Sequence, residues 1–327
     1  LEFKKEVAER YTYAVARIRA KELSLLDKQA FDRLMACGTY GECLGVLHDL
    51  GWGDGDEDSG EEILAAERSK TWELLRELVP DMGVFDVFLY PIDYNNLKAA
   101  VKSTVTGAQP EGIFLPGGTV APERMVEAVE KNDFSPLPER MRGPAQEAYQ
   151  TLLHTRDGQL CDVILDAAAL SAIREAGAAS DSRMIREYAE MTVAIADIKI
   201  AVPSCKTGKT AAFLKRALVP CAPLDVDSLA TAAVRGEGEL FAYLANTPYA
   251  AAADRWKESA SAFEKWCDDT VIELIKAEKS NPFTIGPLAA YLLARENEMK
   301  SVRILLSGKR NRISDGVIRE RLRETYV

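Results

Sequence analysis

The stretch NLKAAVKSTVTG, residues 96–107, decides the fold because related stretches follow it at a regular spacing. DIKIAVPSCKTG, residues 197–208, begins 101 positions later, and EMKSVRILLSG, residues 298–308, begins after a second step of 101. Each copy starts with a polar residue, an apolar residue and a lysine, and each has a glycine near its end. A fixed period of this kind indicates a chain built from repeated structural units.

The copies and the segments between them have the start and stop signals of helices. Ser59 and Glu62 have the spacing of a capping box in front of an apolar pattern. An apolar stripe over residues 254–279 predicts one long helix. Pro287 and Gly308 predict the first turn and the end of another. Because few β-branched runs alternate with polar residues, we expect an all-α fold.

The stretch PSCKTGKTAAF, residues 203–213, contains Gly-Lys-Thr at residues 208–210, which are the last three residues of the phosphate-binding P-loop motif. A P-loop also needs a glycine five positions before Gly208, where this chain has Pro203. Gly-Lys returns at residues 308–309, so we interpret Gly208 as a helix-ending glycine with positive φ and Thr210 as the cap of the next helix. Pro203 should kink the preceding helix or end it early. Direct nucleotide binding is the minor alternative and is not expected.

The composition argues against several classes of function. A net charge of −10 disfavours a nucleic-acid partner, which would need a basic surface. Two histidines and six scattered cysteines without a C-x-x-C pair make a zinc site and disulfides unexpected. No uncharged apolar stretch approaches the ~18–20 residues of a membrane helix. The sequence also begins without the pattern of a signal peptide, so we expect a cytoplasmic chain.

An acidic loop contains an incomplete calcium motif. Asp54, Asp56 and Asp58 imitate the start of an EF-hand. Ser59 stands where that loop needs glycine, and Ala65 stands where it needs a bidentate glutamate. A solvated loop that leads into a helix is the simpler interpretation. We therefore predict no metal ion, and the sequence contains no motif that predicts a cofactor. Adjacent acidic pairs such as Asp268 and Asp269 point to different sides of a helix, so we also predict no catalytic residues.

Four runs of the sequence carry a resemblance to a known family: YTYAVARIRAKELSLL (11–26), FLYPIDYNNLKAAVK (88–102), GPLAAYLLARENEMKSVRILLSGK (286–309) and IRERLRETYV (318–327). They resemble the C subunit of the prokaryotic V-type (A/V-type) ATP synthases, which corresponds to the d subunit of the eukaryotic vacuolar ATPase. The resemblance extends over nearly the whole chain.

This resemblance implies a funnel-shaped, all-α helical repeat protein with three similar subdomains in pseudo-threefold symmetry. We expect a single unit over residues 1–327, with approximate repeats at 5–85, 86–187, 188–286 and 287–327. The implied function is a non-catalytic connector in the central stalk, which couples the central-shaft subunits to the membrane rotor ring during proton or sodium transport. Such a protein lies at the membrane as a peripheral part of the ATPase. The alternative is a stand-alone α-helical scaffold that binds another protein.

Basic side chains on the repeated helices are the candidate interface with these partners. Lys98, Lys199 and Lys300 occupy one place in the three copies, and Arg19 occupies it in a weaker copy near the start. Each lysine follows an apolar residue that should face the core, and the next position on a helix is rotated by about 100°. We predict that these four side chains face inward at similar depth near the pseudo-threefold axis. The remaining candidates lie toward the C-terminal end, on the last copy and on an expected basic helix: Arg303, Arg319, Arg321 and Arg323.

Two alternative interpretations of the repeated lysines stay open. A lysine can stabilise its own helix, as Glu296 and Lys300 would do at the i,i+4 spacing by ~0.3–0.5 kcal/mol. The copies can also have inherited the lysine from a common ancestral repeat, without any role in binding.

Overall fold

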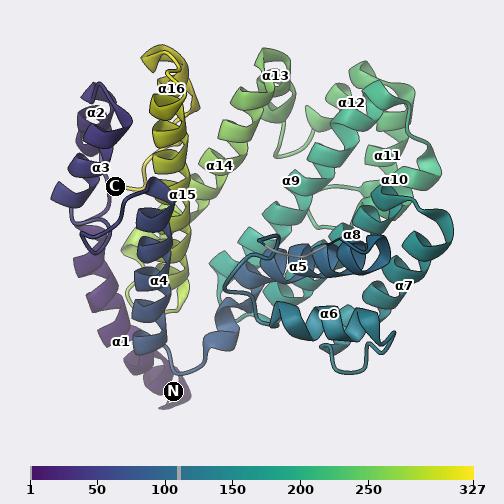
Figure 1. Cartoon of the computed structure of the whole chain (residues 1–327), viewed down its shortest axis with the longest axis horizontal. Coiled ribbons are helices and arrows are strands. Elements are labelled where there is room, and N and C mark those ends of the chain that lie inside the picture. The colour runs from purple at the N-terminus through teal and green to yellow at the C-terminus, as the bar shows by residue number, and fades with distance from the viewer. Residues whose placement is uncertain (1, 109–111) are drawn as a thin grey trace. The chain divides into compact units, whose positions relative to one another are not determined.

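The computed structural model describes residues 2–108 and 112–327, with side chains from residue 11 onward. Within these ranges the regular structure is helical and contains no strand (Figure 1). The all-α prediction is therefore confirmed. The described chain divides into two compact units. The funnel shape, the pseudo-threefold symmetry and the four repeat boundaries stay predictions.

The first unit combines both ends of the chain, up to Met82 and from Ala251 to Val327, with the short piece Ser182–Ile185. Its helices are α1 (Glu2–Glu22), α2 (Lys28–Ala36), α3 (Tyr40–Asp49), α4 (Gly60–Leu78), α13 (Ala251–Glu258), α14 (Ala260–Lys276), the 3-10 helix η2 (Ala277–Ser280), α15 (Gly286–Arg310) and α16 (Asp315–Arg321). Helix α15 packs against α1, α3, α4, α14 and α16, so it forms the centre of this unit.

The core of the first unit is built where α15 meets the N-terminal helices. Leu34 on α2, Leu47 on α3 and Ile63 on α4 are fully buried. They join Val302 on α15 and Ile318 on α16 in one apolar cluster. The last copy of the repeat thus packs on the N-terminal helices of the chain, beside α4 in Figure 1.

The second unit consists of Gly83–Asp181 and Arg186–Ala250. Its helices are α5 (Asp86–Thr106), α6 (Pro122–Glu130), α7 (Glu139–Thr155), α8 (Gly158–Ala179), most of α9 (Arg183–Thr207), α10 (Ala211–Ala217), α11 (Val226–Arg235) and α12 (Glu237–Leu244), and the 3-10 helix η1 (Met82–Phe85) crosses its first boundary. Helix α5 packs against α6, α7 and α8. Leu97 and Val101 of α5 are fully buried, as the apolar spacing predicts.

Several helix ends lie where the sequence places them. Ser59 and Glu62 form the capping box of α4. Gly208 follows α9 with φ of +63°, and the Thr210 side chain accepts a hydrogen bond from the N–H of Phe213 as the N-cap of α10. Because Gly208 and Thr210 connect two helices, the segment lacks the strand that precedes a P-loop.

The prediction of one helix over residues 254–279 is wrong. The chain is interrupted at Ser259, where φ is −172°, so α13 and α14 are separate helices. The Ser259 side chain accepts a hydrogen bond from the N–H of Ala262 and caps α14. A serine side chain can bond to nearby backbone N–H groups in place of a helical carbonyl oxygen, and so it can interrupt a helix. The apolar spacing continues across Ser259, which is why the pattern alone does not predict the break. The Trp256 and Phe263 rings still pack edge to face across it, 5.1 Å apart.

One predicted helix end is wrong, and one predicted effect of a proline is excluded. Helix α9 continues through Pro203 to Thr207, so Pro203 does not end it early, and a kink at this proline stays a prediction. The buried neighbours Val202 and Ser204 hold this turn by packing, which outweighs the unfavourable local propensity. Helix α15 continues past Gly308 to Arg310, with Gly308 buried inside the helix. Gly308 is needed there for close packing rather than for positive φ.

Candidate interface residues

Two of the repeated lysines form ion pairs within their own unit. Lys98 on α5 lies 2.6 Å from Asp166 on α8, and Lys300 on α15 lies 2.6 Å from Asp268 on α14. In both cases a long helix of the repeat is linked to the neighbour that packs beside it. Lys199 on α9 is half-buried. The structure thus gives Lys98 and Lys300 a structural role, and their role at an interface stays a prediction.

Arg19 joins the end of α1 to the segment that follows α14. Its guanidinium donates to both carboxylate oxygens of Glu22, at 2.7 and 2.8 Å. It also donates to the backbone carbonyl oxygens of Glu278 and Asn281, at 2.6 and 3.3 Å. Glu22 in turn accepts a hydrogen bond from the hydroxyl of the buried Tyr326. Arg19 therefore stabilises the first unit from inside, whatever else it contacts.

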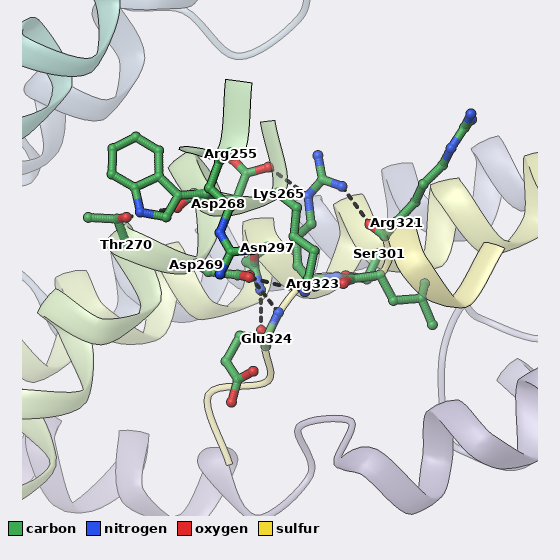
Figure 2. Close-up of polar contacts among 12 residues, drawn as sticks. Arg255, Lys265, Asp268, Asp269, Thr270, Asn297, Ser301, Arg321, Arg323 and Glu324 are labelled. Carbon is green, nitrogen blue, oxygen red and sulfur yellow. Dashed lines mark hydrogen bonds and ion pairs between the residues drawn. The ribbon is translucent and has the colours of Figure 1, made fainter. Parts of the chain in front are cut away.

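The remaining basic candidates differ in exposure. Arg303 pairs with Glu61 across α15 and α4, and Arg319 pairs with Asp32 across α16 and α2. Arg321 is exposed, and in Figure 2 its side chain points away from Asp268. The expected basic helix is shorter than predicted, because α16 ends at Arg321.

Arg323 lies beyond α16, in an extended C-terminal segment rather than on the helix. Its side chain is only 7% exposed and donates from Nε to Asp268 at 2.7 Å. Lys300 pairs with the same carboxylate, so two cations share one acid. Arg323 is thus an internal contact, and the sequence prediction placed it on the wrong kind of element.

Side chains of α14 and α15 hydrogen-bond the backbone of this segment, residues 322–324 (Figure 2). Asp269 accepts the N–H of Glu324 at 2.7 Å, and Asn297 donates to the Glu324 carbonyl oxygen at 2.9 Å. Ser301 accepts the N–H of Arg323 at 3.2 Å. These hydrogen bonds satisfy backbone groups of an irregular segment and, together with the Arg323 side chain, fix its position.

The structure reveals a set of buried residues that the sequence pattern did not single out, namely the polar residue that begins each copy. Asn96, Asp197 and Glu298 are buried. Each accepts a hydrogen bond from the backbone N–H of a loop: Leu115, Val219 and Leu26, respectively. We call these three residues the loop anchors. Their shared place in the copies was visible, but their partners lie outside the repeated helices, 19, 22 and 272 residues away in the sequence.

The Glu298 anchor belongs to a buried ion cluster in the first unit. Arg295 donates to Glu298 and to Glu67, and its guanidinium lies 4.8 Å from the centre of the Trp52 ring. Burial raises the pKa of Glu298, while the adjacent Arg295 opposes that shift. A buried arginine and its carboxylates fix the relative positions of α4 and α15, since a missing partner would leave a charge unpaired.

The acidic loop that imitates a calcium motif is held by contacts within the chain. The Glu57 carboxylate accepts the N–H groups of Asp54 and Gly55, and Lys70 pairs with Asp54. Within the described ranges, no group of three or more His, Cys, Asp or Glu side chains could hold a metal ion. Within the same ranges, none of the helices is both long enough and apolar enough to cross a membrane.

Known proteins resemble the chain along nearly all of its length. A family model described as ATP synthase (C/AC39) subunit matches residues 14–321. The C subunit of the V-type sodium ATPase of Enterococcus hirae is 24% identical, over 94% of this chain and 97% of that protein. The C subunit of the A-type ATP synthase of Methanocaldococcus jannaschii is 23% identical, over 95% and 86%, and that of Desulfurococcus sp. is 26% identical, over 96% and 90%. The resemblance inferred from the four sequence runs is confirmed.

Proposed function

The chain belongs to the ATP synthase (C/AC39) subunit family, and from this premise we propose that it is a non-catalytic connector in the central stalk of a rotary ATPase. In this role it joins the central-shaft subunits to the membrane rotor ring and turns with both. The observation that carries the proposal is the family match along residues 14–321, because a match of this extent covers the architecture rather than one module.

A connector must transmit torque without bending, and the contacts within each unit suit that task. Helix α15 spans 25 residues, which at ~1.5 Å per residue gives a rod of about 37 Å. Ion pairs between helices resist sliding along such rods. Lys102 and Asp162 repeat the Lys98–Asp166 link between α5 and α8 one turn further along. Each such surface pair contributes only ~0.2–1 kcal/mol, so their value lies in fixing the register of neighbouring helices.

The direct test is the composition of the intact machine. The rotary ATPase of the host is purified through a tag on another subunit, and its subunits are identified by mass spectrometry. We expect this chain in the complex, and we expect it to bind the isolated central-shaft subunits in a pull-down. If the complex assembles and works without the chain, the proposal is wrong. If the chain instead binds an unrelated protein, the scaffold alternative is favoured.

The repeated lysines are proposed to contact the shaft, and charge reversal tests this. The double variant Lys98→Glu and Lys199→Glu should bind the shaft subunits at least tenfold more weakly, since it places acids where the proposal needs bases. Lys98→Glu also removes the Asp166 ion pair. Lys131→Glu is the matched control, because it removes an exposed pair with Glu127 in the same unit but lies outside the repeat position.

Both proteins should keep their helical circular dichroism, since ion pairs of this kind contribute only ~0.2–1 kcal/mol each. Unchanged shaft affinity in the double variant, or an equal loss in the Lys131 control, would remove the lysines from the interface. It would leave the connector role itself to be decided by the composition of the complex.

A further inference from the structure

Two loop anchors of the second unit stand at equivalent places but differ in chemistry. Asn96 makes two hydrogen bonds with one residue: Nδ2 donates to the carbonyl oxygen of Leu115, and Oδ1 accepts its N–H, both at 2.8 Å. At the equivalent place, Oδ1 of Asp197 accepts the N–H of Val219 at 3.0 Å. Leu115 and Val219 each precede a proline in the loop that leads to the next short helix.

Asp197 has a second carboxylate oxygen, Oδ2, at the place where Asn96 has an amide donor. The Asp197 side chain is 0% exposed, and among the described residues its Oδ2 has no hydrogen-bond partner. An ionised carboxylate only accepts hydrogen bonds, whereas a protonated one also donates, as an amide does. A buried charge without a cation is unfavourable, so the neutral acid is the form that suits this site.

We propose that Asp197 carries a proton at neutral pH and that its Oδ2–H donates to the carbonyl oxygen of Val219, as the amide of Asn96 does to Leu115. Loss of this proton then replaces a donor with a buried charge. The loop at residues 218–225, which leads into α11, is therefore docked by a bond that depends on pH in the physiological range. The protonated anchor closes the loop, and the ionised anchor weakens it.

The groups around Asp197 agree with a neutral acid. Burial raises the pKa of Asp197 to about 7, and the N–H of Val219 only partly opposes this. Cys221 on the same loop and Tyr249 are neutral near pH 7, because burial raises their pKa values to about 11 and about 12. Glu190, earlier on α9, accepts the N–H of Ala222 at 2.6 Å. It adds a negative charge to this region, which does not favour a second anion.

Arg174 on α8 is the nearby cation, and it defines the rival arrangement. Arg174 lowers the pKa of the Cys221 thiol and Asp197 raises it, so both side chains lie near that thiol. Its Nε is buried without a partner among the described residues. If Arg174 turned toward Asp197, the acid would be ionised and paired. The two arrangements predict opposite responses to pH.

The test compares the pH dependence of unfolding for the wild-type chain and Asp197→Asn. A folded-state pKa above the ordinary value of ~3.9 means that the folded protein binds more protons, so the wild-type chain loses stability as pH rises. The loss begins near the unfolded pKa and is complete above the folded one. Between about pH 5 and 6, the folding equilibrium constant of the asparagine variant should rise relative to wild type by ~10-fold per pH unit, and the rise should level off above the folded-state pKa.

The first copy supplies a matched control by gain of function. Asn96→Asp should acquire the same falling stability profile, because it places an acid at the equivalent anchor. A second readout is direct: infrared spectra of the folded wild-type chain at neutral pH should contain the band of a protonated carboxyl group that Asp197→Asn lacks. This band does not require a comparison of stabilities, so it remains decisive if one variant folds poorly.

A constant ratio of equilibrium constants between wild type and Asp197→Asn across this range would overturn the proposal. So would a wild-type chain that gains stability relative to the variant as pH rises, since that is the behaviour of an ionised Asp197 paired with Arg174. Absence of the protonated-carboxyl band at neutral pH would contradict it independently.

Discussion

Replacing Gly308 with alanine tests how closely α15 and α16 pack in the first unit. Gly308 lies inside α15 and is buried. A Cβ atom added there would lie 2.5 Å from both Cγ1 and Cδ1 of Ile318 on α16. The Ile318 side chain is 2% exposed, so it has little room to move away. We therefore expect the substitution to force the two helices apart or the side chain off its rotamer.

Two effects of opposite sign set the size of the change. Alanine stabilises a helix by ~0.5–1 kcal/mol relative to glycine, because it restricts the unfolded backbone. Overpacking of a filled core costs ~1–3 kcal/mol. Gly308→Ala should therefore lower the free energy of unfolding by about 0–2.5 kcal/mol. Gly45→Ala on α3 is the control in the same unit, since no atom lies within 4 Å of its added Cβ. It should instead raise stability by ~0.5–1 kcal/mol.

Thermal unfolding followed by circular dichroism measures both variants, and a change of 1 kcal/mol should shift the midpoint by about 1–2 °C in a chain of this length. The clash is isolated by a third variant, Gly308→Ala combined with Ile318→Ala. In the Ile318→Ala background, alanine at residue 308 should be stabilising, because the neighbouring atoms are gone. The reasoning fails if Gly308→Ala stabilises the wild-type chain as much as Gly45→Ala does.

Two further predictions concern the first unit. Ser259→Ala should destabilise the chain by ~1 kcal/mol in equilibrium denaturation, because it removes the cap of α14. A change near zero would mean that packing alone sets the break between α13 and α14. Arg323→Ala should lower the free energy of unfolding by ~1.5–3 kcal/mol, since it removes a buried charged hydrogen bond to Asp268. Arg321→Ala, at an exposed position, should lower it by no more than ~0.5 kcal/mol. Equal effects of the two variants in a denaturant titration would contradict the internal position of Arg323.

The sequence predicted helix content and local caps well because these depend on neighbours along the chain. The capping box of Ser59 and the positive φ of Gly208 are decided within a few residues. The apolar residues that precede the lysines, Leu97, Ile198 and Met299, are buried as expected, because helical periodicity separates core from surface.

Features that depend on distant partners were not accessible in the same way. Gly308 resembles the helix-ending glycines at 107 and 208, and only Ile318 on another helix explains its burial within α15. The basic spacing of Arg319, Arg321 and Arg323 suggested one exposed helix. Arg323 instead donates a hydrogen bond to Asp268 on α14, and the residues next to Arg323 in the sequence do not predict that contact.

The loop anchors show which position of the repeat carries the stronger structural constraint. The lysines recur as identical residues, yet the side chains of Lys98 and Lys300 are 22% and 45% exposed. Each forms an ion pair that stabilises the fold by only ~0.2–1 kcal/mol. An unsatisfied buried N–H costs ~1–3 kcal/mol, so the anchor position tolerates less change. Asn96, Asp197 and Glu298 all satisfy it because each presents an oxygen to a loop N–H. What recurs is therefore a hydrogen bond rather than a residue type, so the anchors do not stand out as identical residues in the sequence.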